Sequence, residues 1–140
     1  MKSVLISIVG AVGGAISYCF GGWTESLTTL LIFMGIDFLT GLICAGVFHN
    51  SKKSENGALE SKASFKGLCR KGAIMLIVLV GHRIDLAIGQ AYVRDAVCIA
   101  FIVNETISII ENAGLMGVPI PKVITGAIEV LRKKGSDTNE

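Results

Sequence analysis

Four charged residues of this chain, Asp37, Arg83, Asp85 and Glu105, interrupt stretches of sequence that are otherwise rich in apolar residues. A charged side chain at the centre of a lipid bilayer costs on the order of 2.5–3.5 kcal/mol on insertion scales. Each of these side chains is therefore expected to face another polar group or water rather than lipid. Groups of this kind can pair across helices, couple ion movement or line an aqueous pore.

Three of these charges are predicted to reach the same depth in a membrane. Counted from the outer face, Asp37, Arg83 and Glu105 each lie about nine or ten residues into an apolar stretch, or about 15 Å at the rise of a helix. We expect Arg83 to pair with Asp37 or Glu105, with Asp85 nearby on the same helix. Such a cluster either only holds a helical bundle together or forms a polar face that becomes aqueous when subunits assemble.

Four apolar stretches must position these charges, at residues 4–23, 27–48, 72–92 and 95–115. A helix needs roughly 20 apolar residues to cross a hydrocarbon core of about 30 Å. Because lipid offers no partners for backbone N–H and C=O groups, the stretches are expected to be helical. With 51% hydrophobic residues, the sequence predicts an all-α membrane protein with four transmembrane helices in a single domain over residues 1–135.

Polar segments separate and follow these stretches. Residues 50–66, rich in Ser, Lys, Asn and Gly, are predicted to form a flexible loop. Pro119 and Pro121 should stop the fourth helix. A short amphipathic helix is predicted at residues 122–134, which could lie on the inner leaflet or pack on a neighbouring subunit; its apolar face holds Val123, Ile124, Ala127, Ile128 and Leu131. Residues 136–140 are predicted to be a polar tail.

The distribution of basic residues predicts the topology. Lysine and arginine gather between the second and third stretches and after the fourth, whereas the two other connections carry almost no net charge. The positive-inside rule then places both termini and the central loop in the cytoplasm, as a multi-pass protein. Lys2 and the run Ala15-Ile16-Ser17 also resemble a signal peptide, but the apolar run continues to Trp23, which favours a retained span.

Small residues at a spacing of four suggest where membrane helices approach closely. Gly10 and Gly14 have this spacing in the first stretch, and Gly41 and Ala45 have it in the second. A glycine-rich helix also reaches this spacing by chance. If the spacing is used, it predicts a homo-oligomer within the lipid bilayer.

The sequence offers no chemistry for catalysis. The four cysteines are dispersed without a C-x-x-C pair, so no metal site is predicted, and no zinc-protease motif, phosphate-binding glycine loop or nucleophile elbow is present. Asp37 and Asp85 lack the sequence setting of intramembrane aspartyl proteases. We therefore predict a protein that is not an enzyme, binds no cofactor and does not bind nucleic acid.

Several motifs resemble the toxin-secretion/phage-lysis holin family over about residues 33–131. They include G-I-D-F-L-T-G at 35–41, S-F-K-G-L-C-R-K at 64–71 and H-R-I-D at 82–85. The most specific motif is N-E-T-I-S-I-I-E-N at 104–112, followed by G-V-P-I-P at 117–121. Its family-typical residues are Asn104, Glu105, Ser108, Glu111, Asn112, Gly117, Pro119 and Pro121.

The resemblance implies a phage or prophage protein of the bacterial inner (cytoplasmic) membrane. Holins assemble into lesions that release an endolysin and lyse the host cell, and relatives are associated with the export of large toxins. The released endolysin or toxin is cargo rather than a necessary binding partner. Two alternatives from other classes remain open: a small ion or solute transporter or channel, with the buried charges as a coupling site, and a non-conducting membrane scaffold.

Overall fold

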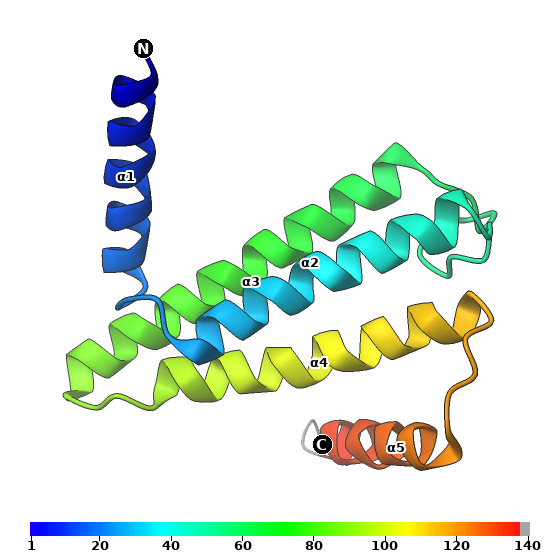
Figure 1. Ribbon diagram of the computed structural model, residues 1–140. Helices are drawn as coiled ribbons and strands as arrows, with labels where there is room; N and C mark the ends of the chain where they lie inside the picture. The colour runs from blue at the N-terminus through cyan, green and yellow to red at the C-terminus, as the bar shows by residue number, and fades with distance from the viewer. Residues whose placement is uncertain (138–140) are drawn as a thin grey trace.

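The computed structural model describes residues 1–137, which form five α-helices joined by connections without regular structure (Figure 1). Over this part of the chain there is no strand, so the all-helical prediction is confirmed. In chain order the helices are α1 (Lys2–Cys19), α2 (Glu25–Gly46), α3 (Ser61–Ile88), α4 (Val93–Leu115) and α5 (Lys122–Asp137).

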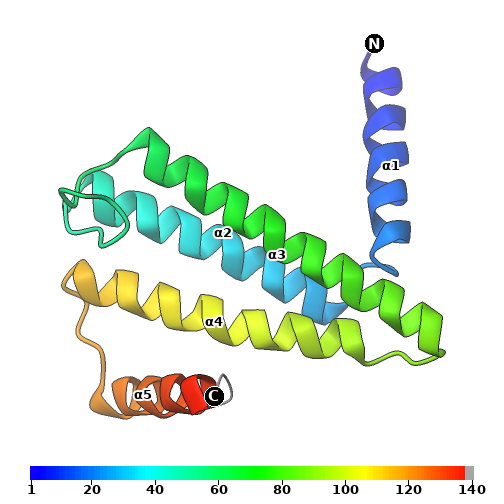
Figure 2. The same cartoon turned by 180° about the vertical axis from the view of Figure 1, so that it is seen from behind.

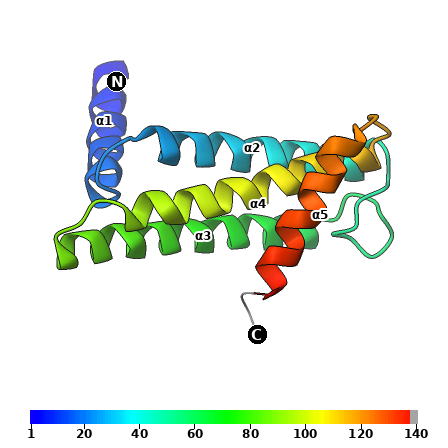
Figure 3. The ribbon, with the colours of Figure 1, turned by 90° about the horizontal axis from the view of Figure 1, so that it is seen from below.

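Three of the helices form a bundle, and the other two lie outside it. α2, α3 and α4 run side by side, whereas α1 projects away from one end of the bundle and buries none of its residues (Figures 1 and 2). α5 turns back beneath α4 at an angle to the bundle (Figure 3), and an ion pair joins Arg132 of α5 to Glu111 of α4.

The apolar core occupies one end of the bundle, near the connections that follow α1 and α3. Leu27, Leu30 and Met34 of α2 pack there against Val78 of α3 and Cys98 of α4, and all five are buried. The α2 residues follow a three-then-four spacing, which keeps side chains on one helix face. The same stripe continues along α2 through Asp37 and Cys44, so a carboxylate occupies a position that the helix pattern assigns to the core.

By length and composition, two helices are candidate membrane spans rather than the four predicted. α1 has a mean hydropathy of 1.5 and α2 of 2.0 over the most apolar window. α3 and α4 are longer than α1, but they carry more charged side chains, among them Lys62, Lys66, Arg70, Lys71, Arg83 and Asp85 in α3 and Arg94, Asp95, Glu105 and Glu111 in α4.

Several predicted boundaries also differ from the structure. α3 begins at Ser61 instead of residue 72, because the Lys- and Ala-containing segment that follows Glu60 favours helix and extends the packing face of α3. The predicted loop at 50–66 is correspondingly shorter. α1 ends at Cys19 instead of residue 23, since Gly21 and Gly22 adopt positive φ angles of 78° and 96°. α5 reaches Asp137, and residues 138–140 of the predicted tail lie outside the described residues.

Asp85 links the ends of α3 and α4. Its carboxylate accepts hydrogen bonds from the backbone N–H groups of Val93 (2.8 Å) and Arg94 (3.0 Å), which are the first residues of α4. These N–H groups have no partner within their own helix, and a carboxylate also suits the positive end of the helix dipole. Gly89 ends α3 in the left-handed conformation (φ 68°), which allows the chain to turn toward this cap.

We expect Asp85→Ala to lower the free energy of unfolding in mild detergent by about 1–2 kcal/mol, because two helix-terminal donors lose their acceptor. Hydrogen exchange should accelerate at the amides of Val93 and Arg94. Asp85→Asn retains one acceptor oxygen and should lose less stability. The matched control is Arg83→Gln, two residues away on the exposed face of α3, which should change stability by less than about 0.5 kcal/mol. Equal losses in the alanine variant and the control would contradict the capping role.

Candidate functional site

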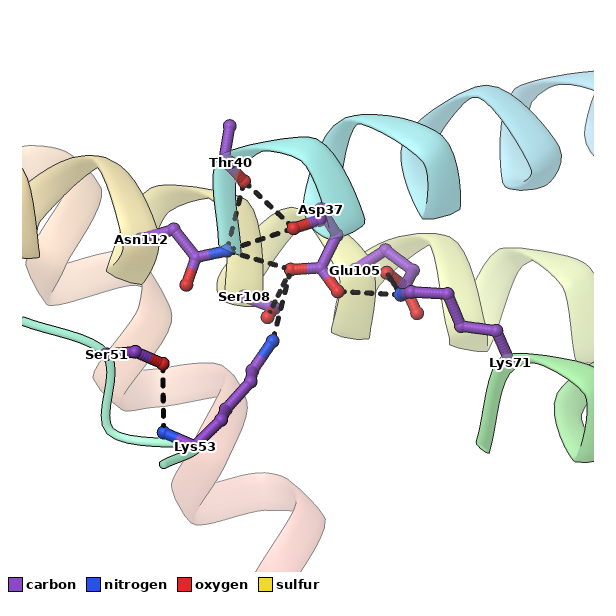
Figure 4. Close-up of polar contacts among 8 residues, drawn as sticks. All are labelled: Asp37, Thr40, Ser51, Lys53, Lys71, Glu105, Ser108 and Asn112. Carbon is purple, nitrogen blue, oxygen red and sulfur yellow. Dashed lines mark hydrogen bonds and ion pairs between the residues drawn. The ribbon is translucent and has the colours of Figure 1, made fainter. Parts of the chain in front are cut away.

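The candidate site is a network of charged and polar side chains that joins α2, α3 and α4 near the middle of the bundle (Figure 4). Its centre is Lys71 of α3, whose Nζ lies 2.7 Å from Asp37 Oδ2 on α2 and 2.8 Å from Glu105 Oε2 on α4. The carboxylates are almost fully buried, at 4% and 3% exposure. One ammonium group therefore bridges two carboxylates from different helices.

Neutral side chains of α4 complete the environment of Asp37. Ser108 Oγ donates to Asp37 Oδ1 at 2.6 Å, and Asn112 Nδ2 donates to the same oxygen at 3.1 Å. The Asn112 amide also reaches the backbone carbonyl of Asp37 and the hydroxyl of Thr40. Buried polar groups are stable only when their hydrogen bonds are satisfied, and this carboxylate has a partner on each oxygen.

The heptad spacing explains why these α4 residues act together. Glu105, Ser108 and Asn112 are separated by three and then four positions, which places them on the face of α4 that contacts α2. They account for three residues of the family-typical motif at 104–112. Asn104 is exposed, and Glu111 faces outward to pair with Arg132.

Lys53 approaches the network from the connection between α2 and α3. Its Nζ lies 3.7 Å from Asp37 Oδ1, and its side chain is about half exposed. The two buried carboxylates share one ammonium group, so Lys53 balances the remaining negative charge. A partly exposed pair at this distance is expected to contribute less than about 1 kcal/mol.

A cavity of about 250 Å³ lies beside the network. Asp37, Glu105, Ser108 and Lys71 form part of its wall, and the connection that carries Lys53 covers another part. No group of three or more His, Cys, Asp or Glu side chains suitable for a metal ion occurs among residues 1–137. The arrangement is an ion-pair network with an adjacent polar cavity, and we find no nucleophile with an activating base in it.

The expected pairing of Arg83 with Asp37 or Glu105 is wrong. Arg83 lies on the exposed face of α3, and no other described residue forms an ion pair with it. The depth estimate assumed a span that ends at residue 92, whereas α3 ends at Ile88, about 8 Å along the axis from Arg83. Lys71, which lies outside the predicted span, is the cation that pairs with Asp37 and Glu105 instead.

The remaining predicted residues fall into three places. Asp85 is buried at the other end of the bundle as the cap of α4. Gly41 and Ala45 lie inside the monomer, where a Cβ added to Gly41 would be 3.7 Å from the Asn112 amide. Gly10 and Gly14 have open space around them on α1. Gly117, Pro119 and Pro121 form the turn between α4 and α5, where Gly117 has a φ of 86°.

Sequence reasoning missed Lys71 although a signal for it was available. Lys71, Val78 and Asp85 follow one another at intervals of seven residues. Val78 and Asp85 are buried on the face of α3 that packs in the bundle. Extending this register backward places Lys71 on the same face. The apolar stretch predicted at 72–92 begins one residue after Lys71.

We expect Lys71→Met to lower the free energy of unfolding in mild detergent by about 3–5 kcal/mol, because two buried carboxylates lose their common cation. Adding Asp37→Asn and Glu105→Gln in the same chain should restore much of this loss, since the uncompensated charges are then gone. The measurement is a denaturant titration followed by circular dichroism.

The control for this cycle is Arg83→Met, which removes an equivalent charge from the same helix and should have little effect. Asp37→Asn combined with Arg83→Met should show no coupling beyond the single changes. The observed network would be contradicted if Asp37→Asn restored the stability of the Arg83→Met variant while Asp37→Asn and Glu105→Gln together failed to restore that of the Lys71→Met variant.

Comparison with known proteins shows which family the chain belongs to. The sequence pattern of the bacteriophage holin family matches residues 14–133. An uncharacterized protein of Halalkalibacterium halodurans is 37% identical over 138 residues, covering 94% of this chain and 96% of that protein. A protein of Bacillus phage phi105 named probable holin is 32% identical over 125 residues, covering 89% and 86%. No solved structure matches the chain.

The family pattern spans all of α2, α3 and α4 and therefore contains every member of the Lys71 network. The resemblance noted from the motifs is thus confirmed over most of the chain. On this evidence the protein belongs to the bacteriophage holin family.

Proposed function

We propose that this protein is a holin that forms a homo-oligomer in the bacterial cytoplasmic membrane and opens lesions through which an endolysin or a large toxin leaves the cell. The observation that carries the proposal is the bridge from Lys71 to Asp37 and Glu105. It places charge inside a bundle whose outer surface is largely apolar. Membership of the holin family supports the same function.

The network gives a physical route from a harmless monomer to a lesion. While its charges satisfy one another, the bundle can reside in lipid without exposing them. When copies associate, separation of α2 from α3 and α4 would let water and neighbouring subunits replace the internal partners. The same side chains would then line an aqueous opening, so no additional polar surface is required.

The proposed topology retains four spans. α3 and α4 carry charges, but Lys71, Asp85 and Glu105 are partnered within the bundle, which lowers the cost of placing these helices in lipid. Both termini and the connection between α2 and α3 would be cytoplasmic, since these segments carry the basic residues.

Single cysteines test this topology in a background without Cys19, Cys44, Cys69 and Cys98. A membrane-impermeant thiol reagent added to intact cells should label a cysteine at Glu25 and should spare cysteines at Lys53 and Lys134. The latter two should react after the membrane is permeabilised. Labelling at Lys53 in intact cells would contradict the four-span arrangement.

Lesion formation is tested by induced expression together with an endolysin that lacks its own export signal. We expect abrupt lysis, and we expect the purified protein in liposomes to release fluorescent dextrans as well as small dyes. Release of ions alone would indicate a channel or transporter, and no release would indicate a scaffold. Either of the last two outcomes contradicts the proposal.

The α1 helix is proposed to bring copies together. Gly10→Leu with Gly14→Leu should weaken oligomers in mild detergent and delay lysis, because bulky side chains keep helices apart. The open space around both glycines means that the folded monomer should be unaffected. The matched control is Ala11→Leu with Ala15→Leu, which has the same spacing on a neighbouring face. Equal delays for both double variants would show that the glycine face has no special role.

A further inference from the structure

The cavity beside the Lys71 network has a second wall that the network does not use. Lys66 and Arg70 stand one turn apart on α3 and line this wall, where both are exposed. Neither forms an ion pair with another described residue. Asp37 and Glu105 already share Lys71, so Glu60 is the one carboxylate of the wall that is not paired with a cation among the described residues. Lys66 and Arg70 together outweigh the charge of Glu60, so the net charge of these unpaired groups is positive.

A buried hydroxyl in the cavity wall has no hydrogen-bond partner. Ser54 Oγ is the single buried side-chain nitrogen or oxygen atom among the described residues that lacks one. Ser54 belongs to the connection between α2 and α3 that lines the cavity. A buried polar group without a partner costs about 1–3 kcal/mol, so this hydroxyl is suited to a ligand that accepts a hydrogen bond.

Apolar side chains border the same cavity. Phe38 and Leu42 of α2 and Ile74 of α3 line it. The wall of the cavity therefore has a polar part, with basic and hydroxyl groups, and an apolar part. A ligand that fits both parts has an anionic head and a hydrocarbon chain.

We propose that this cavity binds the phosphate head group of an anionic phospholipid, with Lys66, Arg70 and Ser54 as the phosphate contacts. The inference rests on the membrane location in the proposed function. Basic pockets between helices at the cytoplasmic side of membrane proteins suit such head groups, and the positive-inside assignment places the α2–α3 connection there. Free inorganic phosphate shares the anionic chemistry but cannot use the apolar wall.

Native mass spectrometry of the detergent-solubilised protein tests the site with short-chain phosphatidylglycerol, phosphatidylcholine and inorganic phosphate as probes. Phosphatidylglycerol should bind most tightly. Lys66→Gln with Arg70→Gln should weaken its binding about 25-fold, because each basic residue near an anionic lipid contributes roughly fivefold. Ser54→Ala should weaken binding about fivefold. Glu60→Gln should strengthen binding, since it removes the opposing carboxylate.

The matched control is Lys52→Gln with Arg83→Gln, which removes the same charge from exposed positions outside the cavity wall. It should change binding by less than about twofold. Equal losses in the two double variants, equal binding of the two lipids, or competition by inorganic phosphate at the same concentration as the lipid would each overturn the proposal. Lipid binding is measured without lysis or leakage. Loss of the lipid-binding proposal would therefore leave the result of the lysis assay standing, and a negative lysis assay would leave the measured lipid binding standing.

Discussion

The bridge of Lys71 between Asp37 and Glu105 is the interaction on which the rest of the bundle depends. It ties three helices together at one level, and it does so with side chains that cannot be left unpaired in an apolar interior. The positions of these three residues on their helices determine which faces of α2, α3 and α4 meet. The apolar core at one end and the cavity at the other both follow from this alignment.

The two ends of the bundle consequently differ in character. At the α1 end, leucine, methionine, valine and cysteine side chains pack closely, and Asp85 caps α4. A Cβ added to Gly81 there would lie 3.2 Å from the Arg94 backbone, so α3 and α4 approach closely. At the other end, polar residues occupy the same heptad positions and a cavity remains. If a lesion forms by separation of the helices, the polar end is the part that can accept water without losing apolar contacts.

α1 adds a surface that the monomer does not use. It has a mean hydropathy of 1.5, buries no residue and is joined to the bundle through Gly21 and Gly22. Arg94 holds this junction by donating hydrogen bonds to the carbonyls of Phe20 (2.7 Å) and Gly21 (3.1 Å). The helix is thus anchored at one end and free along its length to contact lipid or another copy. Under the proposed function, α1 brings copies of the protein together, whereas α2, α3 and α4 carry the polar network.

The sequence by itself determined that the chain is helical and apolar, that charges lie within its helices and that its motifs belong to the holin family. These properties follow from local composition and from residues close together in the chain. Asp37 and Glu105 could be selected because a charge within an apolar helix is costly wherever the helix packs. The motif also indicated Ser108 and Asn112, because their spacing from Glu105 keeps them on one face.

Only the tertiary structure decided which cation these carboxylates share. Pairing depends on how far α3 is shifted along α2 and α4, and this shift depends on where α3 begins and on the packing of Val78 and Gly81. The packing of α3 places Lys71 level with Asp37 and Glu105, whereas Arg83 lies on the surface, on the face of α3 away from the buried Asp85. Ser54 and Lys66 likewise became neighbours of one cavity only when the connection folded over it. Sequence patterns determine the face of a helix on which a residue lies, whereas contact between helices also requires their relative axial position.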